Sequence, residues 1–217
     1  MDVGVLTVVC LLLGVLAIRA GARALSKRNE SEGRAGRAWW AVVVMVAGLT
    51  AWFVEASHQQ RQFLTSDALS VLTENPDARA NCKRFTESLL DTSQFDGFVY
   101  WDNLGVAHFK GHICKDLAAY ARGGQANPTL DQVAAVVLVA HESQHMLNIR
   151  SESVAECNAV QDAHKVAMHL GATMEQALAL QARYFVEIYP HQRSEYVSRE
   201  CREGGSLDIY PDRTEFP

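Results

Sequence analysis

The sequence of 217 residues has no surplus of basic side chains: 20 Lys and Arg stand against 25 Asp and Glu, and the net charge is −5. Proteins that bind nucleic acid usually carry a basic patch, whereas the basic residues here gather in one short segment. The sequence also has no internal repeat and no low-complexity stretch. We therefore expect no nucleic-acid partner, and the length suits one folded domain with an appendage.

Charge is absent from two stretches near the N-terminus, residues 3–18 and 38–54, and this predicts two transmembrane helices. A buried core helix is the alternative. The acidic start Met1-Asp2 and the lack of a clear cleavage site indicate a retained span rather than a signal peptide. Four aromatic residues lie at the two ends of the second stretch, as in the aromatic belts of membrane helices: Trp39, Trp40, Trp52 and Phe53.

Basic residues are concentrated between the two apolar stretches, where six Lys and Arg occur with only Glu30 and Glu32. Short loops with this bias stay on the cytoplasmic side of a membrane. We therefore expect a transmembrane hairpin over residues 1–55, so that both termini lie outside. An extracytoplasmic domain then follows over residues 56–217. The alternative is a solvated charge run in a soluble linker.

Cysteine usage fits an oxidising compartment for the outer domain. Cys10 lies in the first apolar stretch, and the other four all follow the second stretch: Cys82, Cys114, Cys157 and Cys201. This even number predicts two disulfides. Three pairings are possible, and we favour Cys82 with Cys114 and Cys157 with Cys201 because each ties neighbouring segments. A zinc cluster of Cys and His is the alternative, but the sequence has no Cys-x-x-Cys pair.

The expected outer domain is mainly α, with a small antiparallel hairpin, which makes it an α+β fold. Two β-rich runs, GFVYW and VAHFKGHIC, surround turn residues and predict the hairpin. Thr129 and Gln132 form a capping box before a helical pattern over 130–146 that is apolar on nearly every side. Further expected elements are a turn at 75–77, helices over 152–170 and from 173 to before Pro190, and an ordered C-terminal loop held through Cys201.

The motif His141-Glu142-Ser143-Gln144-His145 lies at the end of the apolar helix. Two histidines four residues apart project from one helix face and can reach one ion, with the Glu between them turned toward a water beside it. The motif therefore predicts zinc (Zn²⁺) bound by His141 and His145, with Glu142 as general base in peptide hydrolysis. A pair of core histidines satisfied without metal is the alternative.

A catalytic zinc site also takes a third protein ligand and keeps one position open. Glu152 and Glu156 are four residues apart at the start of the next predicted helix, so they share a face. One of them can bind zinc while the other supports a ligating histidine. Ordinary surface carboxylates of a helix would give the same spacing.

Together, His141-Glu142-x-x-His145 and Glu152-x-x-x-Glu156 resemble the gluzincins, the thermolysin-like branch of the zincin metallopeptidases. The resemblance covers about residues 128–170. It implies that Glu152 is the third zinc ligand and that Glu156, in place of the more usual Asp, orients His141. It also implies that an edge strand of the hairpin sheet binds the substrate in extended form.

The link between His145 and Glu152 has only six residues, far fewer than in thermolysin. Metzincins have such a short link, but with Gly at the turn and a third His, where this sequence has Asn148 and Ser151. The resemblance is therefore to a small, divergent zincin group. It implies a membrane-anchored zinc metallopeptidase that acts on peptides or proteins. The alternative is an inactive zincin-like binding or structural module at the cell surface.

Zincins stabilise the oxyanion of the reaction with a Tyr, His or Arg that lies far from the motif in sequence. The sequence offers several such residues downstream and does not select among them. The Tyr and His candidates are Tyr184, Tyr189, Tyr196, His164, His169 and His191.

Overall fold

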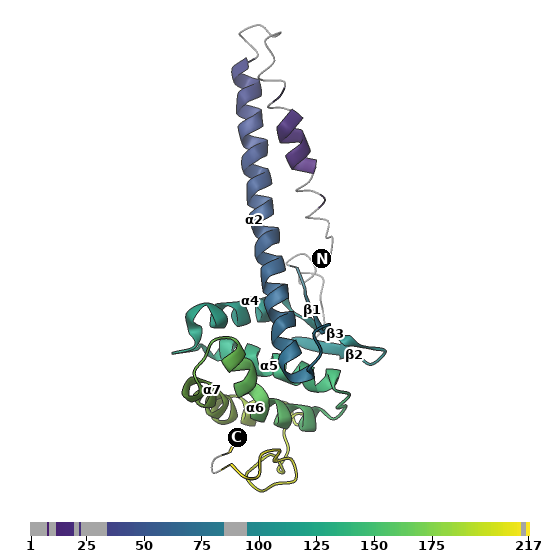
Figure 1. Ribbon diagram of the computed structural model, residues 1–217, viewed down its shortest axis with the longest axis vertical. Helices are drawn as coiled ribbons and strands as arrows, with labels where there is room; N and C mark the ends of the chain where they lie inside the picture. The colour runs from purple at the N-terminus through teal and green to yellow at the C-terminus, as the bar shows by residue number, and fades with distance from the viewer. Residues whose placement is uncertain (1–7, 9–11, 20–21, 23–33, 85–94, 214–215) are drawn as a thin grey trace. The chain divides into compact units, whose positions relative to one another are not determined.

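The computed structural model describes residues 8, 12–19, 22, 34–84, 95–213 and 216–217 (Figure 1). The chain divides into two compact units, residues 1–60 and residues 61–217. The boundary expected between residues 55 and 56 lies inside helix α2 (Arg34–Thr73), which belongs in part to each unit.

Helix α2 has 40 residues, so it is about 60 Å long, roughly twice the thickness of a hydrocarbon core. Its segment Val42–Thr73 is long and apolar enough to cross a membrane. The predicted span 38–54 is helical, but the helix does not end there because no Gly or Pro follows until Pro76. The four residues of the expected aromatic belt are all exposed: Trp39, Trp40, Trp52 and Phe53.

The other predicted span, residues 3–18, lies partly outside the described residues. Its described positions, residues 8 and 12–18, are helical. Most of the basic loop between the two spans also lies outside the described part of the chain. Within that part, the segment in α2 is the one helix that meets the length and hydropathy of a membrane span.

The second unit contains a three-stranded sheet in the order β1-β3-β2. Strands β2 (Gly97–Tyr100) and β3 (Asn103–Phe109) form the predicted antiparallel hairpin. Strand β1 (Arg79–Cys82) adds to the other side of β3 in parallel, which was not predicted. A strand of four residues contains too few alternations of buried and exposed positions to be recognised in the sequence.

The helices of the second unit follow the sheet and include three that were predicted. They are α4 (Gly111–Ala119), the π-helical turn η2 (Tyr120–Gly124), α5 (Leu130–Met146), α6 (Glu152–His169), α7 (Met174–Glu187) and the short η3 (Tyr189–His191). The capping box predicted at Thr129 is present at the start of α5, and Thr173 forms a second one with Gln176 at the start of α7. Gly171, with φ of 96°, follows the end of α6.

The expectation that β structure continues through Cys114 was wrong. Strand β3 ends at Phe109, and α4 begins at Gly111. The reason is the spacing of the apolar residues, which lie three or four apart and make one buried helical face: Ile113, Cys114, Leu117 and Ala118.

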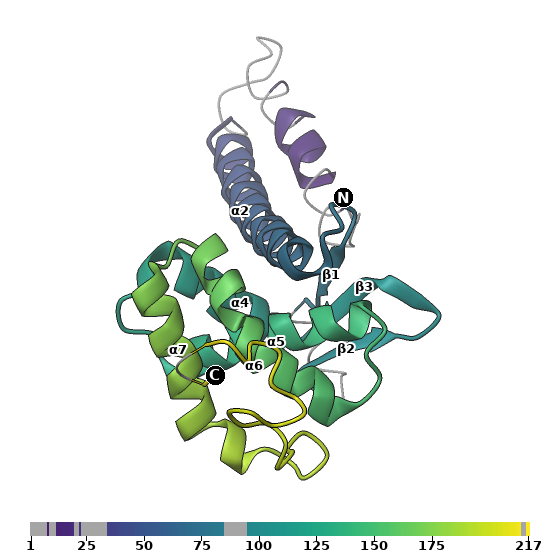
Figure 2. The same ribbon diagram turned by 60° about the horizontal axis from the view of Figure 1, so that its bottom comes forward.

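Helix α5 is the centre of the second unit. It packs against α6, α7, α4 and the hairpin strands, and in Figure 2 it lies between the sheet and α7. Most of its apolar residues are buried, as its sequence predicted, whereas Ala134 and Leu138 are partly buried and Leu130 is exposed. The two favoured disulfides are confirmed: Cys82–Cys114 joins β1 to α4, and Cys157–Cys201 joins α6 to the C-terminal loop.

Candidate metal centre

Helix α5 ends in a tight reversal at Asn148. The N–H of Ile149 donates to the carbonyl of Gln144 at 3.1 Å, and the N–H of Asn148 donates to that of His145 at 2.8 Å. This is the Schellman arrangement, in which one residue takes the left-handed conformation. Asn148 takes it, with φ of 67°. The short link that distinguishes this sequence from thermolysin is thus closed by the helix end itself.

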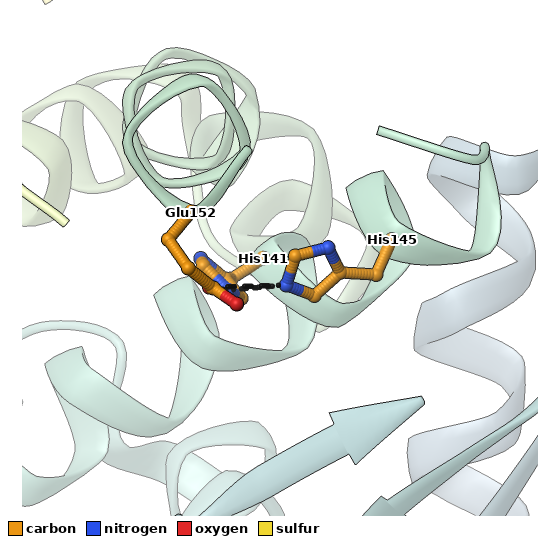
Figure 3. Close-up of side chains that lie close together, drawn as sticks. All are labelled: His141, His145 and Glu152. Carbon is orange, nitrogen blue, oxygen red and sulfur yellow. Dashed lines mark hydrogen bonds and ion pairs between the residues drawn. The ribbon is translucent and has the colours of Figure 1, made fainter. Parts of the chain in front are cut away.

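The reversal brings Glu152, the first residue of α6, against the two histidines of α5 (Figure 3). The Nε2 atoms of His141 and His145 are 2.9 Å apart, and Oε2 of Glu152 lies 3.1 Å from the first and 3.2 Å from the second. A tetrahedral zinc ion with bonds of about 2.0–2.1 Å separates its ligand atoms by about 3.3 Å. The three side chains therefore form a group that could hold a metal ion after small shifts.

Hydrogen bonds fix the proton positions on both histidines. Nδ1 of His141 is 2.8 Å from Oε2 of Glu156, and Nδ1 of His145 is 2.7 Å from the carbonyl oxygen of Ile149. A carboxylate and a carbonyl accept hydrogen bonds, so in the neutral rings Nδ1 carries the proton and Nε2 presents a lone pair. Two nitrogen lone pairs and the Glu152 oxygen then converge. This arrangement is unfavourable without a positive charge between the three atoms.

The pKa values of the same side chains agree with that requirement. Burial lowers the pKa of His141, but hydrogen bonds to Glu152 and Glu156 outweigh burial and raise the pKa to about 10. Hydrogen bonds with His141 and His145 lower the pKa of Glu152 to about 2. A proton bound to His141 and a metal ion supply positive charge at the same place, so the two compete.

Glu156 lies one turn further along α6 and holds His141 in place. Its side chain is buried, and one oxygen accepts from His141 while the other accepts from the hydroxyl of Tyr184. The Tyr184 oxygen accepts in turn from Nε2 of Gln192 at 3.0 Å. Because both of its oxygens are engaged, Glu156 orients His141 and is not one of the group of three. This role of Tyr184 and Gln192 could not be predicted from the sequence, because both lie far along the chain from Glu156.

Glu142 has a different environment. Its carboxyl group is buried, and Oε2 has no hydrogen-bond partner among the described residues. A Cβ atom on Gly97 would lie 2.6 Å from its Oε1, so a side chain at the start of β2 would displace the Glu142 carboxyl group. Burial raises the pKa of Glu142 to about 7. A carboxyl group of this kind can take up and release a proton near neutral pH.

A cavity of about 190 Å³ opens beside His141 and Glu142. Its apolar wall includes Ile113, Ala134 and Leu138. The loop after α7 contributes Arg193 and Tyr196. The ring of Tyr196 is 5.6 Å from that of His141, and Nη2 of Arg193 donates to the Tyr196 oxygen at 3.2 Å.

Tyr196 is distinguished from the other oxyanion candidates by its place in this cavity. Among the described residues, its hydroxyl accepts from Arg193 and donates to no acceptor. Tyr184 also lines the cavity, but its hydroxyl donates to Glu156. The remaining four candidates do not line it: Tyr189, His164, His169 and His191.

The structure places all the residues predicted from the motif around one point. His141 and His145 come from α5 and Glu152 comes from α6, with Glu156 and Glu142 alongside. Comparisons of the chain with protein-family models, with curated proteins and with solved structures found no match.

Proposed function

We propose that the chain is a zinc-dependent metallopeptidase anchored in a membrane. The observation that carries the proposal is the convergence of two histidine lone pairs and a glutamate oxygen beside the buried carboxyl group of Glu142. Two imidazoles and a carboxylate are a ligand set of catalytic zinc sites, which leave a fourth position open. Bound zinc would polarise a carbonyl group and lower the pKa of a bound water.

Each side chain around the site has a task in this proposal. Glu142 takes the proton of the attacking water and later delivers it to the leaving nitrogen. Glu156 and the Ile149 carbonyl keep the protons of the two histidines on Nδ1. Tyr196 donates its free hydroxyl hydrogen to the oxyanion, while Arg193 holds its oxygen.

The substrate in this proposal is an extended peptide. Strand β2 is at the edge of the sheet formed by the described strands, and its first residue, Gly97, lies against Glu142. A peptide that pairs with β2 by strand addition would run past the general base. The absence of a side chain at Gly97 lets the Glu142 carboxyl group lie directly against the strand.

The membrane topology completes the proposal. We infer a multi-pass anchor, with spans over residues 3–18 and 38–54, a cytoplasmic basic loop, and both termini and the peptidase domain outside. The long apolar segment Val42–Thr73 supports one of the two spans. The disulfides Cys82–Cys114 and Cys157–Cys201 support an oxidising compartment for the domain.

The test compares full-length wild-type protein in detergent with the variants Glu142→Gln and Glu175→Gln. Glu142 is outside the metal ligand set, so Glu142→Gln should retain zinc yet lower the rate of peptide cleavage by at least ~10²-fold. Glu175, which is exposed in the first turn of α7, is the matched control and should change neither quantity. Zinc is measured by elemental analysis and cleavage by mass spectrometry of a peptide library.

Two outcomes would decide against the proposed reaction. An unchanged cleavage rate in Glu142→Gln would remove this residue as the general base. Wild-type protein that binds zinc but cleaves no peptide in the library would instead be a zincin-like binding module.

A further inference from the structure

Two arginines lie close to the metal centre, each with its guanidinium group at cation–π distance from an aromatic ring. The first is Arg150, in the link between α5 and α6. Its guanidinium group lies 5.2 Å from the centre of the Trp101 ring, at the tip of the β2–β3 hairpin. The Trp101 ring is in turn 5.4 Å from the ring of His145, edge on. Arg150 therefore lies beside the His145 end of the metal centre.

The second arginine, Arg193, lies beside the other histidine. Its guanidinium group is 5.2 Å from the ring of Tyr196 and 5.0 Å from that of Phe95. Tyr196 and Arg193 both line the cavity that His141 and Glu142 border. Each histidine of the pair thus has an aromatic ring beside it, and each of these rings has an arginine over it.

The charges around the two arginines leave them available to a ligand. Arg150 is exposed and has no carboxylate partner among the described residues. Arg193 has an ion pair with Glu195 at 3.3 Å, but both side chains are about half exposed, and exposed pairs of this kind contribute little. Contact with a ring restricts the planar guanidinium group, so less entropy is lost when it binds a carboxylate.

Most of the acidic groups near the cavity already have partners. Glu152 pairs with His141 and His145, and Glu142, whose Oε2 has no hydrogen-bond partner among the described residues, interacts with the same two histidines. Asp96 pairs with the ammonium group of Lys110 at 3.1 Å. Glu156 accepts from His141 and Tyr184. A substrate carboxylate that reaches Arg150 or Arg193 would therefore replace water or a weak surface pair.

We propose that this site prefers peptides with an acidic side chain on each side of the bond that is cleaved, one recognised by Arg150 and the other by Arg193. The inference that these peptides are cleaved rests on the proposed peptidase function. Recognition by the two arginines does not require turnover. Neither arginine is assigned contact with the reacting atoms in this role. Each is a specificity residue that reads one side of the substrate.

The experiment measures binding and cleavage separately, on full-length protein in a neutral detergent. Binding is measured by fluorescence anisotropy with labelled peptides and zinc-loaded Glu142→Gln protein, which cannot turn them over if the proposed mechanism holds. The peptides share one neutral core, and a single Glu or its Gln counterpart is moved through the three positions on each side of the central bond. Cleavage of the same peptides by wild-type protein is followed by mass spectrometry.

We expect Glu peptides to bind about 5-fold more tightly than Gln peptides at one position on each side of the bond, the upper range for partly exposed pairs. Arg150→Gln should abolish the preference on one side only, and Arg193→Gln the preference on the other. High salt should reduce both preferences. Arg199→Gln, an exposed arginine of the same C-terminal loop, is the matched control and should leave both unchanged.

Each remaining outcome has a defined meaning. Equal binding of Glu and Gln peptides overturns the inference. So does a result in which Arg150→Gln and Arg193→Gln both lose the preference for Glu at the same peptide position. Loss of zinc in Arg150→Gln or Arg193→Gln would show that the residue supports the metal centre instead, which also overturns it. Acidic peptides that bind as expected but are not cleaved by wild-type protein would contradict the peptidase function and leave the recognition intact. Cleavage of the peptides without a preference for acidic side chains would support the peptidase function and overturn the recognition by the arginines.

Discussion

Helix α6 contributes to two clusters around buried histidines. The clusters differ in how the histidine nitrogen atoms are satisfied. Near its start, Glu152 meets His141 and His145, and three acceptor atoms converge. Further along, His164 donates from Nδ1 to the Gln161 carbonyl at 2.9 Å, and its Nε2 accepts from Arg213 at 3.1 Å. The second histidine is satisfied by protein atoms alone. In the first cluster the converging atoms need a positive charge between them, from a proton on His141 or from a metal ion.

The same contrast appears in the pKa values of the two histidines. Burial lowers the pKa of His164, which keeps the ring neutral between its partners. Burial acts on His141 in the same direction, but two glutamates outweigh it and raise the pKa. Burial of a histidine therefore does not by itself indicate a metal site. The number of lone pairs that meet at one point is the more informative property.

The largest expected effect is loss of the metal from the first cluster. Glu152→Ala removes a ligand and leaves two histidines, so zinc affinity should fall by more than the roughly 100-fold typical of losses outside the ligand set. His164→Ala, the matched change in the second cluster, should keep zinc affinity and lower the free energy of unfolding by about 1–3 kcal/mol. Competition with a chromophoric chelator and thermal unfolding measure the two quantities. The comparison fails if His164→Ala loses zinc while Glu152→Ala retains it.

The next largest effect on zinc affinity distinguishes the proposed ligand Glu152 from Glu156, which orients His141. Glu156→Gln removes the charge that orients His141 but no ligand atom, so zinc affinity should fall only about 10- to 100-fold. Tyr184→Phe, which removes one of the two bonds to Glu156, should have a smaller effect in the same assay. If Glu156→Gln loses the metal entirely, the roles of Glu152 and Glu156 must be exchanged.

The arrangement of α5, the turn at Asn148 and the start of α6 could be predicted from the sequence, because the signals for it lie within this one segment. The Thr129 and Gln132 box starts α5, and Asn148 ends it, so the spacing from His141 to Glu156 follows from helix geometry. Those positions lie within one helix–turn–helix segment. No long-range contact is needed to place them.

The cavity wall could not be predicted because it comes from a distant segment. Gln192, Arg193 and Tyr196 follow α7, and their loop is tied to α6 through the Cys157–Cys201 disulfide and through the hydrogen bonds of Tyr184 with Gln192 and Glu156. No periodic pattern relates such residues to the motif. Strand β1 escaped prediction for a related reason, since its pairing with β3 joins segments that are far apart in sequence.

The smallest expected effect concerns the reversal that brings the first cluster together. Asn148 has φ of 67°, a conformation that costs most residues about 1–2 kcal/mol and that glycine adopts freely. Asn148→Val should therefore lower the free energy of unfolding by about 1–2 kcal/mol, whereas Asn148→Gly should change it little. Chemical denaturation of the two variants in the same detergent measures the difference. Equal stability of the Val and Gly variants would mean that this turn is not held in the left-handed conformation.

The ligand set itself is tested most directly by X-ray absorption spectroscopy of the zinc-loaded, full-length protein. We predict a first coordination shell of nitrogen and oxygen atoms at about 2.0–2.1 Å, with the outer scattering of two imidazole rings. Glu152→Ala should lose this spectrum or replace the carboxylate by water. Sulfur ligands at about 2.3 Å would contradict the account, because they would place the metal on cysteines that the structure pairs as disulfides.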